Sequence, residues 1–170
     1  MVAAGGETRR ADLRLRRAQL ADGPALLRLV DALAEYERLA PPDAAARARL
    51  LRDAFHDPPR IEVHLAELDG TAVGYALSFE TYSSFLALPT LFLEDLFVLP
   101  EHRGRGIGRA LFLLLAEDAR RRGCGRMEWS VLTWNEPALG FYDRLGARRM
   151  EEWVTYRLTA AELERLASSG

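Results

Sequence analysis

The sequence predicts a mixed α/β fold, with a mostly antiparallel central sheet, one parallel strand pair and helices on both faces. Three observations predict it. Two apolar segments flank Asp69-Gly70, a pair typical of the tight turn of an antiparallel hairpin. A strand-like segment, a long helical segment and another strand-like segment follow, which is the order of a parallel crossover. Further helical segments precede the hairpin, so helices exist for each face of the sheet.

The first elements are a strand and two helices. Residues 13–16 alternate between leucine and arginine with the period of a half-buried strand. Asp22 is a helix N-cap, and apolar residues at helical spacing extend that helix to about Glu37. Asp43 caps a second helix after two prolines, and the Asp-Pro-Pro at 57–59 stops it.

The central part of the chain supplies the hairpin and the long helix. Strands are expected over 61–68 and 71–79, on either side of the tight turn, and over 91–99. A helix rich in leucine and alanine extends from 106 to 122, and Gly123 ends it as a C-terminal cap.

The last elements are shorter. Residues 126–132 predict a strand, and residues 135–145 predict a short helix that begins at an N-capping asparagine. A final strand is expected over 152–158. Thr159 then caps a terminal helix.

Length and composition fit one domain over residues 12–170, preceded by a loose, disordered leader over residues 1–11. Hydrophobic residues make up 49% and charged residues 28%, the balance of an ordinary globular protein. The net charge of -2 and the lack of a basic arm give no general attraction to nucleic acid or anionic lipid. The single Cys124, with no signal-like or membrane-length apolar run, predicts a cytoplasmic protein without a membrane partner.

Three glycines interrupt the start of the long helix, at Gly104, Gly106 and Gly108. Glycine costs stability there unless the backbone must stay bare or approach a ligand closely. Main-chain N–H groups at a helix N-terminus are unpaired donors aligned with the helix dipole, so this loop predicts a phosphate site. Local positive charge is supplied by Arg103, Arg105 and Arg109.

The spacing of the loop excludes two familiar phosphate motifs. A P-loop needs Gly-Lys followed by Ser or Thr, and this loop contains no lysine. A dinucleotide-binding fingerprint needs its third glycine one residue later, within an opening strand-turn-helix unit. A flexible turn is the remaining structural alternative.

The loop and its flanks resemble a known family. Residues 103–108 match the Arg/Gln-x-x-Gly-x-Gly/Ala motif of the GCN5-related N-acetyltransferases (GNAT superfamily). Within that superfamily the chain is similar to the diamine branch, which acetylates spermidine, spermine and thialysine. The residues that carry this similarity are Tyr36-Glu37, Leu93 to Val98, Trp134 to Pro137 and Phe141-Tyr142, within a resemblance over residues 13–158. It implies a GNAT fold, acetyl-CoA as co-substrate, a small amine acceptor and a homodimer, for which the apolar segment 85–92 offers surface.

Two adjacent acids, Glu94 and Asp95, lie in an otherwise apolar strand. An alkyl ammonium, which titrates near ~10, must lose a proton before it attacks a thioester. Burial raises the pKa of a carboxyl group toward values useful for a base. Because side chains alternate along a strand, only one acid lines a given cleft unless a bulge redirects the other. We choose Glu94 as the base, acting through water; pairing of either acid with an arginine in the sheet is the alternative.

Tyr142 lies seven residues after Asn135, so the two residues share a helix face two turns apart. Asn135 would cap the helix and bind the amide arm of the cofactor. Tyr142, a phenol with a pKa near ~10, would protonate the departing sulfur. Packing in the core beside Phe141 is the alternative for Tyr142.

The resemblance also assigns the remaining site residues. Main-chain groups of Leu96 and Val98 would hold the acetyl and pantetheine portions, and strand amides near Leu96 would meet the carbonyl oxygen. The expected cofactor-binding residues are Leu96, Phe97, Val98, Arg103, Gly104, Arg105, Gly106, Ile107, Gly108, Arg109, Asn135, Pro137, Ala138 and Tyr142. The expected acceptor-binding residues are Tyr36, Glu37, Glu94, Glu128, Trp129 and Ser130, of which Trp129 also fits the core.

One segment departs from the branch. Tyr82 to Phe85 reads Tyr-Ser-Ser-Phe where spermidine/spermine enzymes carry an acidic turn with a tryptophan. Without that carboxylate a second, distant ammonium is held less well, which leaves shorter amines or thialysine-like amino acids open. Acetylation of a protein or peptide amine is a further alternative. So is an acyl-CoA-binding module without turnover, although such a module would need neither Glu94 nor Tyr142.

Other reactive residues are assigned no role in the reaction. Cys124 follows a helix-capping glycine and has no histidine nearby, which favours a spectator thiol. His56, His64 and His102 lack the spacing of metal ligands, so we expect no metal. Three arginines at 120–122 complement the dipole at a helix C-terminus and indicate a solvated face rather than nucleic-acid binding.

Overall fold

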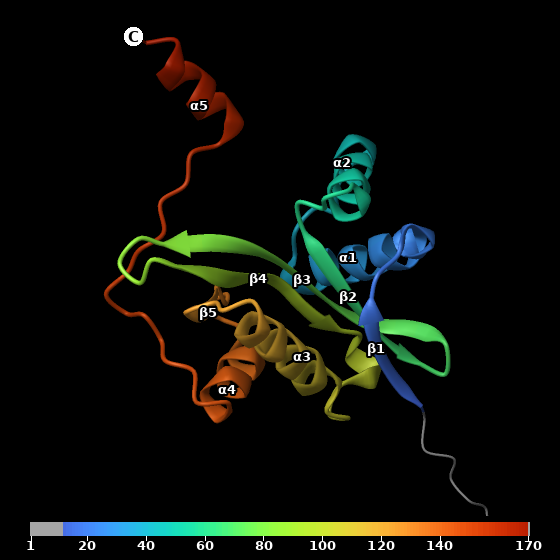
Figure 1. Ribbon diagram of the computed structural model, residues 1–170. Coiled ribbons are helices and arrows are strands. Elements are labelled where there is room, and N and C mark those ends of the chain that lie inside the picture. The colour runs from blue at the N-terminus through green and yellow to red at the C-terminus, as the bar shows by residue number, and fades with distance from the viewer. Residues whose placement is uncertain (1–11, 170) are drawn as a thin grey trace, which may run out of the picture. The chain divides into compact units, whose positions relative to one another are not determined.

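A five-stranded sheet in the order β1-β2-β3-β4-β5 organises the N-terminal part of the computed structural model (Figure 1). The first three pairings are antiparallel, and the pairing of β4 with β5 is parallel. The strands are β1 Leu13–Arg17, β2 Glu62–Leu68, β3 Thr71–Ser83, β4 Leu88–Val98 and β5 Arg126–Trp129. The mixed sheet predicted from the hairpin and crossover signals is therefore confirmed.

The structure describes residues 12–169, so the leader expected over residues 1–11 lies outside the described residues. Contacts within the chain divide it into two compact units, residues 1–130 and 131–170. The sheet belongs to the first unit. The second contains the helices α4 Glu136–Arg144 and α5 Ala160–Ala167. The expectation of one domain over 12–170 stays a prediction.

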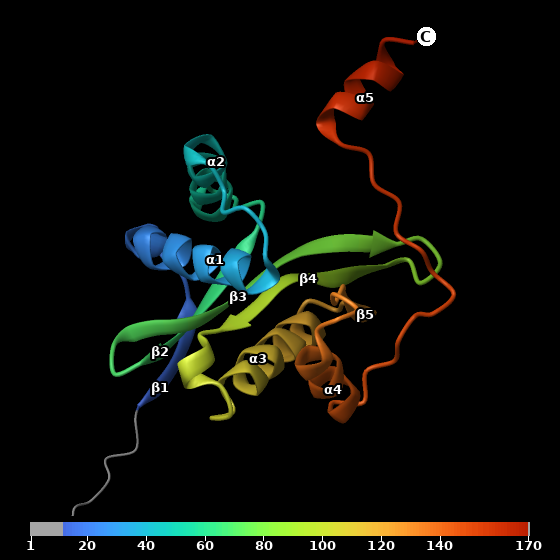
Figure 2. The ribbon, with the colours of Figure 1, turned by 180° about the vertical axis from the view of Figure 1, so that it is seen from behind.

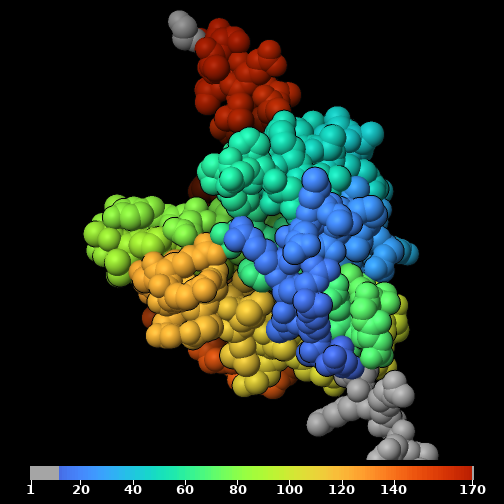
Figure 3. All heavy atoms as spheres, turned by 45° about the vertical axis from the view of Figure 1, so that its right-hand side comes forward, coloured from blue at the N-terminus to red at the C-terminus, as the bar shows by residue number. Residues whose placement is uncertain are grey.

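Helices cover both faces of the sheet, as expected. The helices α1 Gly23–Glu37 and α2 Ala44–Phe55 lie on one face, and α3 Ile107–Arg121 lies on the other (Figures 1 and 2). Two short 3-10 turns, η1 Leu20–Asp22 and η2 Pro100–His102, precede α1 and follow β4. In the space-filling view α2, in teal, lies beside α1, in blue (Figure 3). An ion pair between Arg47 and Asp31, 2.6 Å long, links these two helices.

The predicted helix caps differ in how they work. The Asp43 carboxylate accepts a hydrogen bond from the Ala46 main-chain N–H at 2.7 Å and caps α2 as expected. Asp22 precedes α1, but its carboxylate instead accepts from Arg16 Nη1 at 2.7 Å and from the Gln19 N–H at 2.7 Å. The hydrogen bond from Arg16 is the main reason that the pKa of Asp22 falls to about 2. Asp22 therefore fastens strand β1 to the start of α1.

Each helix layer buries leucines against the sheet. On the α1 face, Leu26 and Leu29 are fully buried in a cluster with Leu65 and Tyr75. On the α3 face, buried apolar residues recur at every fourth position, at Ile107, Leu111, Leu115 and Ala119, and Phe112 is buried beside them. The sheet is thus held between two apolar layers, which fixes the position of β4.

Strand β4 carries one extra residue opposite β3. Leu77 pairs with Asp95, whereas the next residue, Ser78, pairs with Leu93. Glu94 is therefore left without a partner on β3, which is the geometry of a β-bulge. A bulge turns two successive side chains toward one face of the sheet, so Glu94 and Asp95 no longer alternate.

Two predictions for the C-terminal part were wrong. Strand β5 ends at Trp129 instead of continuing to residue 132. Residues 152–158 form no strand, although their composition favours one. A strand needs a neighbouring strand to satisfy its main chain, and the described residues of the second unit contain only helices α4 and α5.

Between residues 12 and 169, none of the helices combines the length and the apolar character that crossing a bilayer requires.

The core can be tested with a pair of leucines. We expect Leu29→Ala, at a side chain with 0% exposure, to lower the free energy of unfolding by about 2–5 kcal/mol because it leaves a cavity under α1. Leu113→Ala is the matched control: Leu113 lies on α3 with 44% exposure, and we expect a loss below about 0.5 kcal/mol. Urea unfolding followed by circular dichroism measures both. Equal losses in the two variants would contradict the assigned core.

Candidate functional site

A cavity of about 590 Å³ opens on the α1 and α2 face of the sheet. Its walls are mostly apolar, and the two acids Glu94 and Asp95 both line it. The apolar lining residues are Val30, Ala40, Pro42, Ala46, Leu50, Ile61, Leu77 and Phe79. The bulge in β4 therefore delivers two carboxyl groups to one apolar pocket.

The two acids differ in environment. Glu94 is exposed, whereas Asp95 is half-buried and accepts a hydrogen bond from the Tyr75 hydroxyl at 2.9 Å. Burial, together with the nearby charges of Glu94 and Glu37, raises the pKa of Asp95 to about 6. The hydrogen bond from Tyr75 favours the ionised form and acts against this rise. The raised pKa expected of an acid in this strand is thus found at Asp95, and its partner is a tyrosine rather than an arginine.

The end of α1 brings a third acid into the same region. Burial raises the pKa of Glu37, and Arg38 follows with a left-handed backbone that ends the helix. The neighbouring Tyr36 ring lies 6.3 Å from the Phe97 ring, centroid to centroid. Tyr36 and Glu37, the expected acceptor-binding pair, therefore lie near strand β4.

The glycine loop leaves a row of main-chain donors unused. Gly104 and Gly106 have φ angles of +74° and +81°, values that a side chain disfavours. The first helical hydrogen bond of α3 is donated by Ala110 to the Gly106 carbonyl. In the described part of the chain, the N–H groups from Gly104 to Arg109 have no hydrogen-bond acceptor. Such a row at a helix N-terminus is suited to binding phosphate oxygens.

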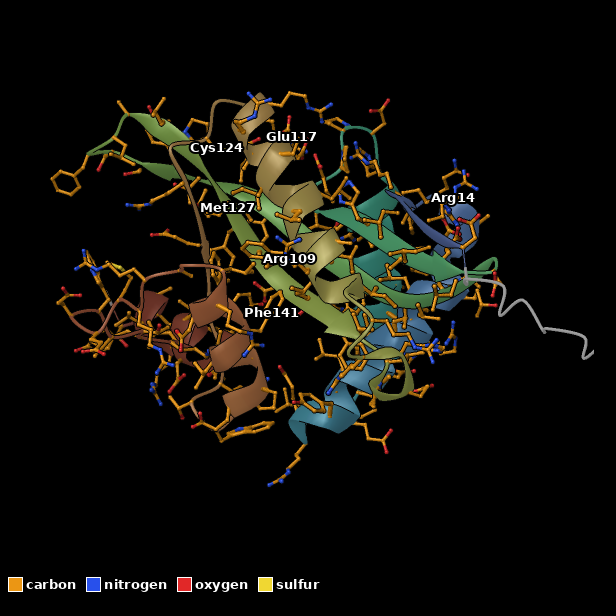
Figure 4. All side chains as sticks on the ribbon, turned by 90° about the horizontal axis from the view of Figure 1, so that it is seen from below. Arg14, Arg109, Glu117, Cys124, Met127 and Phe141 are labelled. Carbon is orange, nitrogen blue, oxygen red and sulfur yellow. The ribbon has the colours of Figure 1, made fainter. Side chains whose placement is uncertain are left out.

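The arginines of the loop serve different purposes. The Arg103 guanidinium donates from Nε to the Val98 carbonyl at 2.8 Å, and its Cζ lies 4.4 Å from the centroid of the Tyr36 ring. Its side chain is therefore turned toward α1, which the sequence did not reveal. Arg109 projects from the first turn of α3 (Figure 4). Arg105 and Arg109 remain as charges beside the loop.

Strand β4 has a free edge next to this loop. Its pairing with β5 ends at Leu93 and Trp129, so the following residues have no partner on β5. This stretch contains Leu96, Phe97 and Val98, three of the expected cofactor-binding residues. The Phe97 and Val98 side chains are buried, so these residues would offer a ligand their main chain.

The expected acceptor-binding residues at β5 make structural contacts. Glu128 pairs with Arg126 at 3.1 Å. The Trp129 ring packs edge-on against Phe112 of α3, with 5.2 Å between centroids, which agrees with a place in the core. Ser130 is exposed at the end of the strand.

The second unit holds the remaining expected residues. The Asn135 side chain accepts a hydrogen bond from the Ala138 N–H at 3.3 Å, so it caps α4 as predicted, and Pro137 lies in the first turn. Tyr142 follows two turns later, edge-on to Phe141 at 5.0 Å between ring centroids. Burial raises the pKa of Tyr142 to about 12.

Residues that were assigned no role in the reaction, such as Cys124 and Arg122, make contacts within the folded chain. Cys124 lies in the turn between α3 and β5 (Figure 4), and burial raises the pKa of its thiol. Arg122 is less solvated than expected, since it is ion-paired with Glu62 and Asp118. Among residues 12–169 no group of three or more His, Cys, Asp or Glu side chains is arranged to hold a metal ion.

Tyr75 is the site residue that sequence reasoning missed. It lies in a strand of small apolar residues and is fully buried. A buried tyrosine nearly always has a partner for its hydroxyl group, and this was the signal in the sequence. The partner itself, Asp95, could be identified only from the pairing of β3 with β4.

Comparisons with known proteins agree with this geometry. The family model described as the acetyltransferase (GNAT) family matches residues 26–147. A thialysine N-epsilon-acetyltransferase from Mus musculus is 31% identical over 168 residues, covering 92% of this chain and 98% of that protein. An L-ornithine N5-acetyltransferase from Arabidopsis thaliana is 37% identical over 111 residues, covering 65% of this chain and 49% of that protein. An integron cassette protein structure from V. cholerae has a TM-score of 0.77 at 25% identity, covering 91% and 97% of the two chains.

The family match spans most of the chain and includes the glycine loop, the bulged strand and helix α4. This protein is therefore an acyltransferase that belongs to the GNAT acetyltransferase family, in the diamine and thialysine branch that its motifs resemble.

Proposed function

We propose that the protein transfers the acetyl group of acetyl-CoA to a primary amine of a small cationic acceptor. The acceptor would be a diamine, a polyamine or a thialysine-like amino acid. The observation that carries the proposal is the apolar cavity with two acids, Glu94 and Asp95, beside the end of α1 with Glu37. Three carboxyl groups in apolar surroundings suit an ammonium group, which forms charge-assisted hydrogen bonds to them. Relatives that act on thialysine and ornithine support an amine of this size.

The residues around the glycine loop fit acetyl-CoA. The free N–H groups from Gly104 to Arg109, with Arg105 and Arg109 nearby, would hold the diphosphate. The free edge of β4 at Leu96, Phe97 and Val98 would hold the pantetheine arm through its main chain. In the second unit, Asn135, Pro137 and Ala138 would contribute from the start of α4. When bound, acetyl-CoA supplies the acetyl group as a thioester.

Two side chains would move the protons. Glu94, exposed at the cavity, takes the proton of the ammonium group through a water molecule, so that the neutral amine attacks. Tyr142 gives a proton to the leaving sulfur; its pKa of about 12 keeps the phenol protonated at neutral pH. Direct attack of the amine then needs no covalent intermediate on the protein.

The turn of the β3–β4 hairpin lacks an acidic residue that could bind the second ammonium group of a long acceptor. The hairpin of β3 and β4 carries Tyr82 near the end of β3 and Phe85 in the turn, both exposed, in place of an acidic turn. A short diamine or amino acid therefore fits the acids of the cavity better than a long polyamine. We also propose a cytoplasmic homodimer without a nucleic-acid or membrane partner. The exposed apolar side chains Phe85, Leu86 and Leu88 at the hairpin tip support self-association.

An acceptor panel tests the proposal. We expect thiol release from acetyl-CoA with short diamines, ornithine or thialysine, and weaker release with spermine or basic peptides. Detection of the free thiol with a chromogenic disulfide gives the rate for each acceptor. Turnover with peptides alone would favour a protein-acetylating enzyme, and binding of acetyl-CoA without turnover would favour a regulatory module.

The glycine loop can be tested separately from catalysis. We expect Gly106→Ala to weaken acetyl-CoA binding roughly 5- to 30-fold, because an alanine disfavours φ +81° by about 1–2 kcal/mol, so the unliganded loop relaxes and binding must restore this conformation. Gly123→Ala is the matched control, since Gly123 ends the same helix with φ +71°. It should lose similar stability without any change in affinity. Calorimetric titration with acetyl-CoA measures both, and equal affinities for the two variants would remove the loop from the diphosphate site.

The proposed acid is tested by removing one oxygen. We expect Tyr142→Phe to lower kcat on the order of 10²-fold, with little change in acetyl-CoA affinity, because proton donation to the sulfur is lost. Tyr156→Phe removes the same atom from a side chain with 91% exposure and should leave kcat unchanged. Steady-state kinetics with a saturating amine give both values. An unchanged kcat in Tyr142→Phe would end this assignment.

A further inference from the structure

The cavity on the α1 and α2 face carries charge on one wall only. Of the ten described residues that line it, eight are apolar, and the two acids, Glu94 and Asp95, both come from β4. Ile61, which precedes β2, lines the cavity from the far side of β3. Two strand spacings, about 10 Å, therefore separate Ile61 from the acids. A bound amine meets carboxyl groups at its reacting end and hydrocarbon along the rest of its length.

The apolar walls are not fully covered by the protein itself. Val30 of α1, Ala46 and Leu50 of α2, Ile61 and Phe79 are all half-buried, and α2 contains no fully buried residue. The cavity volume of about 590 Å³ is within the ~300–1,000 Å³ of small-molecule pockets. A ligand that covers these side chains with hydrocarbon removes apolar surface from water, which favours binding.

An aromatic pair extends the apolar floor of the cavity along the sheet. Phe79 of β3 lies opposite Phe92 of β4, and their ring centroids are 5.3 Å apart. Residues directly opposite each other in a sheet share a face, so Phe92 lies on the same face as the cavity. The next pair on this face, Thr81 and Thr90, is uncharged. The floor is therefore suited to a carbon chain or a ring.

The charged side chains that join the two helices of the cavity already bind each other. Asp31 of α1 accepts from both terminal nitrogens of Arg47 of α2, at 2.6 and 3.0 Å. Arg47 Nε also donates to the Pro42 carbonyl at 2.9 Å. A second ammonium group on the acceptor would have to break this ion pair or lie unpaired against hydrocarbon, which is costly. A second charge on the acceptor therefore gains nothing from these walls.

We propose that the apolar walls select, as acceptors, primary monoamines whose substituent is an uncharged alkyl chain or ring. The inference rests on the proposed function for the acetyl transfer, and it adds a class of acceptor with one charge instead of two. The reaction is unchanged: the N–C bond forms as the C–S bond of the thioester breaks. Of the two protons that the ammonium group loses, one leaves through Glu94 to water and the other is balanced by the proton that the sulfur takes from Tyr142.

A series of alkylamines tests the apolar walls in the unaltered protein. n-Pentylamine and 1,4-diaminobutane have equal length and differ only in a methyl or an ammonium group at the far end. We expect KM to fall about two- to fourfold for each methylene added from propylamine to pentylamine, because each is partly or fully buried. We also expect a higher kcat/KM for pentylamine than for 1,4-diaminobutane. Thiol release from acetyl-CoA at pH 7.5 measures both. A constant KM along the series, or a higher kcat/KM for the diamine, would overturn the proposal.

A charge placed in the apolar wall should reverse the preference. Ala46 lines the cavity from the first turn of α2, and its neighbour Ala45 is exposed. We expect Ala46→Asp to raise the KM of pentylamine on the order of tenfold and to lower that of 1,4-diaminobutane. Ala46→Asn has the same size without the charge and should not favour the diamine.

The matched control is Ala45→Asp, which adds the same charge to the same turn outside the cavity. It should keep the acceptor preference of the unaltered protein. An equal change of preference in Ala45→Asp and Ala46→Asp would contradict the proposal, since the effect would then not come from the cavity wall. Thermal unfolding checks that each variant is folded, and the alkylamine series tests the proposal without any variant.

A binding measurement separates this inference from the proposed function. Calorimetric titration with each amine needs no turnover. If pentylamine binds more tightly than 1,4-diaminobutane, and Ala46→Asp reverses the order, but neither amine is acetylated, the selection by the walls stands and the proposed function fails. If the protein acetylates diamines but neither binds nor acetylates pentylamine, the proposed function stands and the inference is wrong.

Discussion

The unpaired residue in β4 is the constraint on which the candidate site depends. In a regular strand Glu94 and Asp95 would point to opposite faces, one toward α1 and the other toward α3. The bulge at Glu94 places both acids in one cavity and leaves the strand on either side in register with β3. The surroundings of the two acids nevertheless differ. Glu94 is exposed and able to exchange a proton with water, whereas Asp95 is held by Tyr75 in a less polar place.

In the proposed function the same strand also separates the two ligands. Its side chains reach the acceptor cavity on the α1 face, while its main chain beyond Leu93 is free of β5 at the edge next to the glycine loop. A parallel pair that stops after four residues, from Thr90 to Leu93, leaves this edge open. Main-chain groups at this edge of β4 and in the glycine loop are suited to the pantetheine arm and the diphosphate of acetyl-CoA. These parts of the cofactor can be bound without specific side chains. In the proposed function, specificity for the amine is therefore left to the side chains that line the cavity on the α1 face.

Much of this arrangement was predictable from local signals, and the rest depends on contacts between distant residues. The tight turn at Asp69-Gly70 and the cap at Asp43 are local features, and they were predicted correctly. The bulge at Glu94 is a property of the pairing between β3 and β4, which the sequence of neither strand specifies alone. The bond from Tyr75 to Asp95 follows from that pairing and was missed for the same reason. The strand expected over 152–158 was wrong for the opposite reason: its local preference was clear, but no strand lies among residues 131–169 to pair with it.

Arg103 makes contacts within the protein in addition to supplying charge to the glycine loop. Its place at the start of the glycine motif predicted a cation beside a diphosphate. Its guanidinium lies over the Tyr36 ring and donates to the Val98 carbonyl, and its main-chain N–H donates to the Pro100 carbonyl. Because Tyr36 precedes Glu37, this side chain joins the start of the cofactor loop to the end of α1 that borders the acids. The planar guanidinium suits this double contact with an aromatic ring and a carbonyl better than a lysine ammonium would. The arginine of the motif therefore links the start of the loop to the end of α1, and the amides of the following residues remain available for the proposed anion.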